Sequence, residues 1–270
     1  MASRPKIVVT NRVFPETLAF LSPHGEVDAN ASGVPWPAAE VLRRCADATA
    51  IMAFMSDCLD ALFFEACPKL KIVGGALKGA DNIDAAAAER HGVWVTNVPD
   101  LLTIPTAELA IGLMLAAGRH IVAGDRKIRA EGFSGWRPEF YGQGIAGSTV
   151  FIVGFGSIGR ALARRLAPFG CQIVAYDSRA GLECEAQGVS MVAFEEGLAL
   201  ADFAVLAIPL SPKTVHIINA DSLKKMKPGA FLINVARGSL VDEEAVAEAI
   251  DEGRIGGYAA DVFECEDWAR

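Results

Sequence analysis

Short apolar runs alternate with amphipathic stretches through the first hundred residues of the chain. The apolar runs are rich in valine, isoleucine and alanine and predict buried strands at residues 6–10, 50–54, 71–76 and 93–97. The amphipathic stretches predict helices at residues 15–21, 38–45, 59–66 and 85–91. Strands and helices that alternate in this way form a parallel sheet covered on both faces. This first unit spans about residues 1–100.

The same alternation continues after a turn that contains two prolines. Pro105 stands at the opening of a long predicted helix over residues 106–122, and a polar loop with aromatic residues follows over residues 132–142. Further strands are predicted at residues 149–153, 173–176, 203–208, 231–236 and 258–262, with a helix at 242–252. The chain therefore contains a second parallel α/β unit.

Three glycines with a defined spacing follow the strand at residues 149–153. In the pattern formed by Gly154, Gly156 and Gly159, the first glycine makes a tight turn and the second lets the backbone approach a pyrophosphate. The third lets helix and strand pack closely. Asp177 ends the next apolar run, 21 residues after Gly156, where a carboxylate binds a ribose hydroxyl and repels a 2′-phosphate. The pattern predicts NAD, with NADP bound weakly at most.

These patterns predict an α/β protein with two doubly wound parallel-sheet domains. Residues 1–100 are interpreted as a flavodoxin-like substrate-binding domain and residues 101–270 as a Rossmann NAD-binding domain. Ligands of such sheets lie beyond the carboxyl ends of the strands. The positions expected there are Gly154 to Gly159, Asp177, Pro209, Arg237, Asp261 and, from the first unit, Lys78. Two such sheets with a cleft between them predict a hydride-transfer enzyme.

The composition argues against several other classes of protein. The chain of 270 residues is long enough for two domains, and its net charge of −8 argues against binding of nucleic acid. The six cysteines form no C-x-x-C pair, so we interpret them as reduced packing residues and expect no metal site. No apolar run is long enough to span a bilayer and no signal peptide is evident, so we expect a cytoplasmic protein without membrane contacts.

Because the chain is acidic overall, an anionic substrate has to be attracted by a local cluster of cations. Arg237 follows a predicted strand and could clamp an anion through paired donors; the alternative is a surface arginine that bonds a backbone carbonyl. Lys78 lies in a glycine-rich turn after a buried strand and could supply a second charge; the alternative is a solvated loop lysine. We favour the functional interpretation of both residues.

Acidic and aromatic residues give weaker signals. Glu264 and Glu266 lie in an acidic cluster, where a carboxylate could orient a catalytic histidine, although such a cluster taken alone is more often a solvated turn. Trp136 and Tyr141 could cover a cleft or pack against the fold. The four histidines, which we interpret as structural, are His24, His91, His120 and His216.

Several of these segments resemble a known family. The glycine pattern, Asp177, residues 234–239 and residues 260–263 are similar to the D-isomer-specific 2-hydroxyacid dehydrogenase family, and the resemblance covers the whole chain. Further stretches resemble the phosphonate (phosphite) dehydrogenases within that family. They are residues 52–55, 76–79, 98–103, 135–138, 141–142, 257–264 and 266–270.

The resemblance implies NAD-dependent oxidation of phosphite to phosphate, with hydride transfer to the nicotinamide and attack of water on phosphorus. It implies that Lys78 and Arg237 hold the phosphite oxygens and that Glu266 orients a catalytic histidine. Two cations in a water-poor cleft would also stabilise charge on the attacking oxygen. The implied substrate pocket is Met55, Lys78, Trp136, Tyr141 and Arg237. The implied NAD contacts are Lys78, Thr106, Gly154, Gly156, Ser157, Ile158, Gly159, Asp177, Ala207, Ile208, Pro209, Val235, Ala236, Arg237 and Asp261.

The comparison with the family also reveals a departure. In the family, a His-Ile-Gly or His-Leu-Gly segment beyond the acidic motif supplies the catalytic histidine, whereas this chain ends at Arg270. We therefore expect the C-terminal part of the nucleotide domain to be missing, and we expect the chain to bind NAD but to turn over poorly. The resemblance suggests a homodimer built largely on the helix after Pro105.

Two other functions stay open. A D-2-hydroxyacid dehydrogenase that acts on glyoxylate or hydroxypyruvate shares the fold, NAD, Arg237 and Glu266, so Lys78, Trp136 and Tyr141 are the discriminating residues. A non-catalytic NAD-sensing protein is the third possibility. The missing histidine favours that possibility, whereas the two cations Lys78 and Arg237 argue against it.

Overall fold

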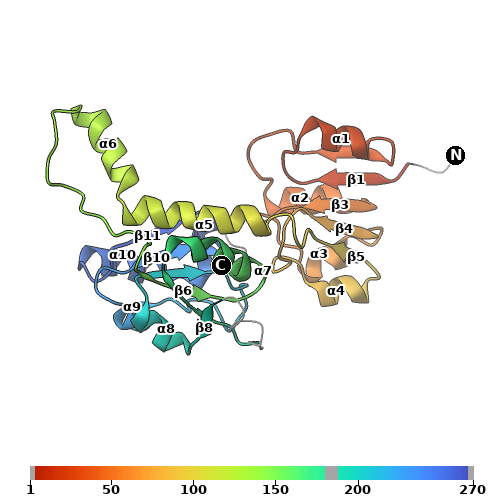
Figure 1. Cartoon of the computed structure of the whole chain (residues 1–270). Helices are drawn as coiled ribbons and strands as arrows, with labels where there is room; N and C mark the ends of the chain where they lie inside the picture. The colour runs from red at the N-terminus through yellow and green to blue at the C-terminus, as the bar shows by residue number, and fades with distance from the viewer. Residues whose placement is uncertain (1–3, 180–187, 267–270) are drawn as a thin grey trace. The chain divides into compact units, whose positions relative to one another are not determined.

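The structure consists of two compact α/β units, each with its own parallel sheet (Figure 1). The computed structural model describes residues 4–179 and 188–266. Unit 1 comprises the residues up to Leu102, and unit 2 comprises Thr103–Glu266. Two parallel sheets packed with helices confirm the predicted fold class.

Unit 1 is a five-stranded parallel sheet with the strand order β2-β1-β3-β4-β5. Its strands are β1 (Lys6–Val9), β2 (Glu26–Ala29), β3 (Ala50–Ala53), β4 (Ile72–Gly75) and β5 (Trp94–Thr96). Its helices are α1 (Pro15–Leu21), α2 (Ala38–Cys45), α3 (Ala61–Ala66) and α4 (Ala85–Arg90). Val8, Ile51 and Val73 come from continuous apolar runs, and they are buried together with Phe63 and Phe64 of α3.

Unit 2 is a six-stranded parallel sheet with the strand order β11-β10-β9-β6-β7-β8. Its strands are β6 (Thr149–Val153), β7 (Gln172–Tyr176), β8 (Val189–Met191), β9 (Phe203–Leu206), β10 (Phe231–Asn234) and β11 (Gly257–Ala260). Its α-helices are α5 (Thr103–Gly118), α6 (Ile121–Glu131), α7 (Ser157–Leu166), α8 (Phe194–Leu200), α9 (Ala220–Lys225) and α10 (Glu243–Asp251). Short 3-10 helices are η1 (Ala167–Phe169), η3 (Gly238–Leu240) and η4 (Glu264–Glu266).

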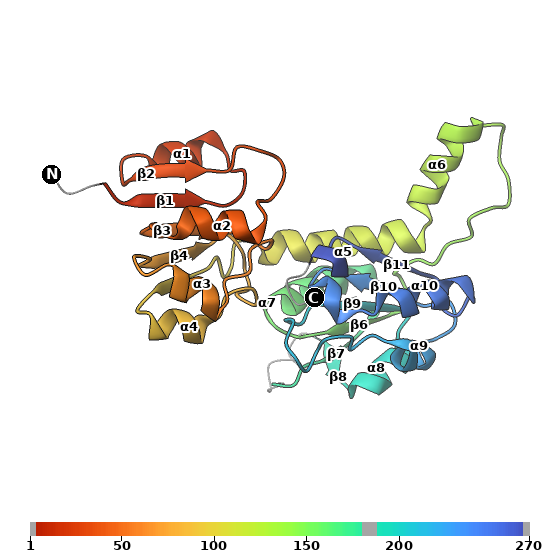
Figure 2. The ribbon, with the colours of Figure 1, turned by 180° about the vertical axis from the view of Figure 1, so that it is seen from behind.

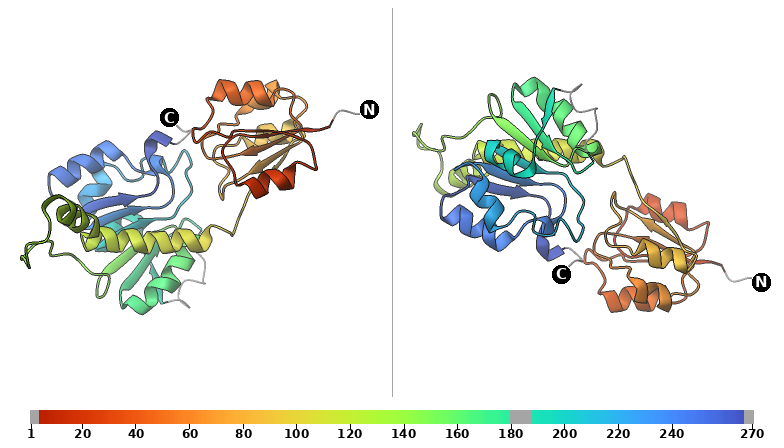
Figure 3. Two further views of the ribbon diagram at one scale, coloured as in Figure 1. Left: turned by 90° about the horizontal axis from the view of Figure 1, so that it is seen from above. Right: turned by 90° about the horizontal axis from the view of Figure 1, so that it is seen from below.

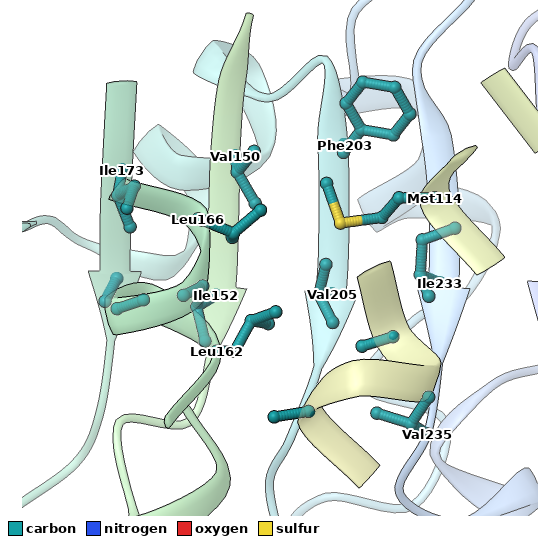
Figure 4. Close-up of a cluster of buried hydrophobic side chains, with 14 of the residues drawn as sticks. Met114, Val150, Ile152, Leu162, Leu166, Ile173, Phe203, Val205, Ile233 and Val235 are labelled. Carbon is teal, nitrogen blue, oxygen red and sulfur yellow. The ribbon is translucent and has the colours of Figure 1, made fainter. Parts of the chain in front are cut away.

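Apolar helix faces cover both sides of the unit 2 sheet. On one side, α5 and α7 contribute Met114, Leu162 and Leu166, which are buried in one cluster with Ile152 and Val205 of the central strands (Figure 4). The same placement of α5 over the strands is visible in Figure 3. The other side is covered by α8, α9 and α10, which contribute Leu198, Leu223 and Val246. Full burial of such a side chain stabilises the fold by about 1.5–3 kcal/mol, so these layers hold the sheet between the helices.

The predicted helix over residues 106–122 is wrong in its extent. Helix α5 begins at Thr103 and ends at Gly118, and α6 leaves its end and points away from the unit 2 sheet (Figure 2). The break occurs because Gln143 N–H donates to the Gly118 carbonyl oxygen at 2.7 Å, while His120 adopts left-handed backbone angles. Within the described part of the chain, no single helix is long and apolar enough to cross a bilayer, although α5 and α6, bent by 56°, pass that test as a pair.

Several elements were not predicted from the hydrophobic pattern. Strand β2 is an edge strand of the unit 1 sheet, and β8 is an edge strand of the unit 2 sheet. Strand β2 alternates polar and apolar residues instead of forming an apolar run. Helices α8 and α9 are short, with 7 and 6 residues. Such short or half-polar elements carry weak periodicity, and only their packing against the sheet distinguishes them from turns.

Candidate active site

The turn between β6 and α7 is built from glycines for steric reasons. Gly154 has φ 104°, and a Cβ atom there would lie 2.5 Å from the Ala207 carbonyl oxygen. A Cβ atom at Gly159 would lie 2.1 Å from the Gly154 carbonyl oxygen. A Cβ atom at Gly156 would instead meet nothing within 4 Å. The first and third glycines are therefore required for packing, whereas the second opens space at the start of α7, where helix N–H groups attract a pyrophosphate.

Asp177 lies directly beside this turn. Phe155 N–H donates to its carboxylate at 2.9 Å, and Arg179 N–H donates to the other carboxylate oxygen at 2.8 Å. Gly154 N–H continues the β6–β7 ladder to the Tyr176 carbonyl oxygen at 2.7 Å. The two segments that the sequence linked by spacing alone are therefore joined by hydrogen bonds.

Five neighbouring strands of unit 2 end at the same edge of the sheet. In sheet order, the residues that follow their last positions are Asp261, Val235, Ala207, Gly154 and Asp177. Ser157 and Ile158 open α7 at this edge, and Ile208 and Pro209 follow Ala207. Parallel strands place their carboxyl ends together, which is why residues far apart in the sequence meet here. Their individual contacts with NAD stay a prediction.

A buried asparagine shapes the turn that carries Arg237. The Asn234 amide donates to the Arg237 carbonyl oxygen at 2.8 Å and accepts from Ala236 N–H at 3.1 Å. The Arg237 guanidinium donates to the Ala236 carbonyl oxygen at 2.7 Å. Burial raises the pKa of Asp261, and the positive charge of Arg237 partly opposes that rise. Arg237 and Asp261 therefore lie near the carboxyl ends of the neighbouring strands β10 and β11.

The acidic cluster forms the 3-10 helix η4. The Glu266 carboxylate accepts from Phe263 N–H, and Glu264 N–H donates to the Glu243 carboxylate at 2.8 Å. The ring Nε2 of His216 lies 2.8 Å from Glu264 Oε1. The interpretation of His216 as purely structural missed this pair, because 48 residues separate the partners and no local motif links them.

The two candidate substrate residues of unit 1 lie in loops after β3 and β4. Met55 is half-buried in the turn after β3, where the Asn82 amide donates to the carbonyl oxygens of Phe54 and Asp57 at 2.9 and 2.8 Å. Lys78 is half-buried after β4, and its carbonyl oxygen accepts from the Asn97 amide at 2.8 Å. Burial lowers the pKa of Lys78, opposed by the charge of Asp100.

Within one copy of unit 2, Trp136 and Tyr141 do not lie beside Arg237 at the carboxyl edge of the sheet. They follow α6 and are 78% and 81% exposed. Their segment returns at Gly118, where a Cβ atom would lie 3.0 Å from the ring of Phe203, the first residue of β9. The segment that carries both aromatic residues therefore rejoins the fold at the amino end of β9. Thr106, in contrast, lies near the start of α5, at the opposite end of that helix.

The glycine turn, the adjacent aspartate and the parallel sheet together define a dinucleotide-binding domain of an oxidoreductase. The sequence model of the NAD-binding domain of the D-isomer specific 2-hydroxyacid dehydrogenases matches residues 111–270. The chain belongs to this D-isomer specific 2-hydroxyacid dehydrogenase family.

Known relatives agree with this assignment. The chain is 38% identical to a glyoxylate reductase of Pyrococcus furiosus over 98% of this chain and 81% of that protein. The TT0316 protein of Thermus thermophilus has a similar structure, with a TM-score of 0.88, 34% identity and coverage of 96% of this chain and 82% of that one. A D-lactate dehydrogenase of Aquifex aeolicus complexed with NAD and lactic acid gives a TM-score of 0.84, 25% identity and coverage of 96% and 77%.

Proposed function

We propose that this protein transfers a hydride between NAD and a small 2-oxo or 2-hydroxy acid of the glyoxylate type. The observation that carries the proposal is the position of Arg237, whose backbone carbonyl oxygen accepts from the Asn234 amide at the same sheet edge as the glycine turn. An arginine there can bind a substrate carboxylate through two parallel hydrogen bonds. The glyoxylate reductases among the relatives support this substrate class over phosphite.

The residues of the site would then have separate tasks. NAD, when bound, supplies or accepts the hydride. The start of α7 would bind its pyrophosphate, and Asp177 would bind a ribose hydroxyl and repel a 2′-phosphate. Arg237 would hold the substrate carboxylate and stabilise negative charge on the substrate oxygen during reduction. Glu266 would orient the group that delivers a proton to that oxygen.

Phosphite is a second candidate substrate, and Lys78 is the observation that favours it. In that reaction, phosphite, water and NAD give phosphate, NADH and a proton, with the hydride leaving phosphorus. A small dianion needs more positive charge than a carboxylate does, and Lys78 would add a second cation to that of Arg237. Met55 would then line the same pocket. A 2-oxo acid, whose carboxylate can be bound by Arg237 alone, would not require this second charge from Lys78.

We also propose that the protein forms a homodimer through α5 and the arm made of α6 and residues 132–142. No residue of α6 is buried, and the arm exposes large apolar side chains. They are Ile121, Val122, Ile128, Phe133, Trp136 and Tyr141. A soluble monomer rarely exposes so many apolar side chains in one region, and a second copy would cover them. Trp136 and Tyr141 would then reach a substrate site only in the partner copy.

The decisive experiment is a substrate panel on the wild-type chain and on the variants Arg237→Ala and Lys78→Ala. Glyoxylate and hydroxypyruvate are tested with NADH, phosphite is tested with NAD, and binding of each anion to the protein with NADH is measured in parallel. Arg237→Ala should weaken every productive anion by at least about 30-fold, since a lost buried charge pair costs 2–5 kcal/mol. Turnover or binding of phosphite alone, abolished by Lys78→Ala, would overturn the 2-oxo acid proposal. Binding of NADH without any anion would overturn both.

A further inference from the structure

His216 connects the two turns that carry the acidic and basic residues of the site. Its backbone N–H donates to the Ser239 carbonyl oxygen of η3 at 2.9 Å, next to the Arg237 turn. Its ring Nε2 lies 2.8 Å from Glu264 Oε1 of η4. One residue therefore contacts both η3 and η4, although it belongs to neither.

The two turns also touch each other directly. A Cβ atom at Gly238 would lie 1.9 Å from the Phe263 carbonyl carbon, so the backbone before η4 packs flat against the first residue of η3. On its other side, η4 is held by Glu243, whose carboxylate accepts from Glu264 N–H at 2.8 Å. Glu264 is thus bonded through its backbone to α10 and through its side chain to His216. A shift of η4 must break one of these contacts.

The backbone of His216 is held in an unfavourable conformation. Its φ is 48°, in the left-handed region that costs a residue with a side chain free energy relative to the right-handed region. Besides the bond from His216 N–H to Ser239, the Asn219 amide donates to the His216 carbonyl oxygen at 2.9 Å, and Ile218 N–H donates to the Leu240 carbonyl oxygen at 3.1 Å. Such strain is typical of residues whose position serves a site.

We propose that His216 is a positioning residue for the hydride-transfer site, acting through its hydrogen bond to Glu264. This inference rests on the proposed function, in which Arg237 binds the substrate anion and Glu266 orients a proton donor. The bond fixes η4, which contains Glu266, relative to the turn that contains Arg237. Loss of the bond lets η4 move and separates the two charged groups, whereas the glycine turn and Asp177 lie on other strands and keep their geometry.

The test compares His216→Gln, which preserves a side-chain donor, with His216→Phe, which removes it. His91→Gln is the matched control, because His91 is an exposed histidine at the end of α4 in unit 1. Binding of NADH is titrated by fluorescence, and binding of oxalate and of phosphite to the protein with NADH is titrated next. Amide hydrogen exchange of residues 261–266 reports on η4 without any substrate.

We expect His216→Phe to weaken anion binding about tenfold or more, since small misplacements in a site have large effects, while NADH affinity changes less than threefold. Exchange at residues 261–266 should rise in His216→Phe, and His216→Gln should restore both properties. The double variant His216→Phe with Glu264→Ala should be no worse than His216→Phe alone. Equal exchange and equal anion binding in wild type and His216→Phe would overturn the inference. If wild-type protein binds NADH but neither anion, the proposed function fails, and the exchange result still decides whether His216 holds η4.

Discussion

The carboxyl edges of the two sheets differ in what occupies the space beyond the strands. In unit 1, the helices that follow β3 and β4 are capped by their own carboxylates: Asp60 accepts from Phe63 N–H and Asp84 from Ala87 N–H, both at 2.9 Å. In unit 2, the helix that follows β6 begins after Gly156, which has no side chain with which to cap it. The strand–turn–helix segments after β3 and β4 are thus closed by protein side chains, whereas the segment after β6 leaves its helix N–H groups for an anion.

A buried polar network completes the closed edge of unit 1. The buried carboxylate of Asp57 accepts from Phe54 N–H at 2.7 Å and from the Thr10 hydroxyl, and Asn82 bonds two carbonyl oxygens of the same turn. These bonds connect the Met55 turn to Thr10, after β1, and to Asn82, before α4. The comparison shows that the turns after β3 and β4 satisfy their own backbone groups, whereas the β6–α7 turn leaves backbone N–H groups for a cofactor.

The largest effect is expected on NADH affinity when a side chain fills the space beside the β6–α7 turn. Gly156→Ala puts a methyl group into the space beyond the β6–α7 turn, so NADH affinity should fall about 5- to 150-fold, from the roughly 1–3 kcal/mol that overpacking costs. The melting temperature should stay unchanged, because the methyl group meets no protein atom within 4 Å. Titration of NADH and thermal unfolding check this. The control is Gly33→Ala, in equally open space in unit 1; normal NADH affinity in Gly156→Ala would contradict the comparison.

The second-largest effect is expected on the stability of unit 1 when the hydrogen bonds of Asn82 are removed. Asn82→Ala leaves the part-buried carbonyl oxygen of Phe54 and the buried carbonyl oxygen of Asp57 without their donor, and the free energy of unfolding should fall by about 1–3 kcal/mol. NADH affinity should not change. Urea unfolding measures the difference against Asn97→Ala, which removes one exposed hydrogen bond. If the two variants are equally stable, the network does not hold the edge closed.

A smaller effect should come from Asp177, which selects among dinucleotides at the open edge. Asp177→Ala removes the charge that repels a 2′-phosphate, so the ratio of NADP to NAD affinity should rise about tenfold. Paired titrations with NADPH and NADH measure this ratio. Asp251→Ala, an exposed aspartate in α10, is the control. An unchanged ratio would mean that the carboxylate serves only its two backbone hydrogen bonds.

The smallest effect concerns the pH dependence of unit 1. Burial raises the pKa of Asp57 above the ordinary value of 3.8, so the folded state holds this proton more tightly than the unfolded state does. The resulting stabilisation is complete below pH 3.8 and is lost as the pH rises through the raised pKa. The stability advantage of wild type over Asp57→Asn should therefore be larger near pH 4 than near pH 7. Urea unfolding at both pH values checks this, and a constant difference would refute it.

Local sequence determined much of the fold and the geometry of the glycine turn. The apolar runs that became β1, β3, β4, β6, β9 and β10 are long enough to require burial on both faces. The glycine pattern lies within one turn, so its spacing predicted its geometry. Arg237 and Asp261 followed from a general rule about the carboxyl ends of parallel strands, not from their own neighbours.

Tertiary structure alone decided the remaining features, because each depends on atoms far apart in the chain. Helix α5 ends at Gly118, whose carbonyl oxygen accepts from Gln143 N–H, and the exposed segment that carries Trp136 and Tyr141 lies between these two residues in the chain. The pairing of His216 with Glu264 spans 48 residues, and each partner by itself is an ordinary polar residue. Hydrophobic periodicity describes which face of an element is buried; it contains no information on which polar side chains meet when those faces pack.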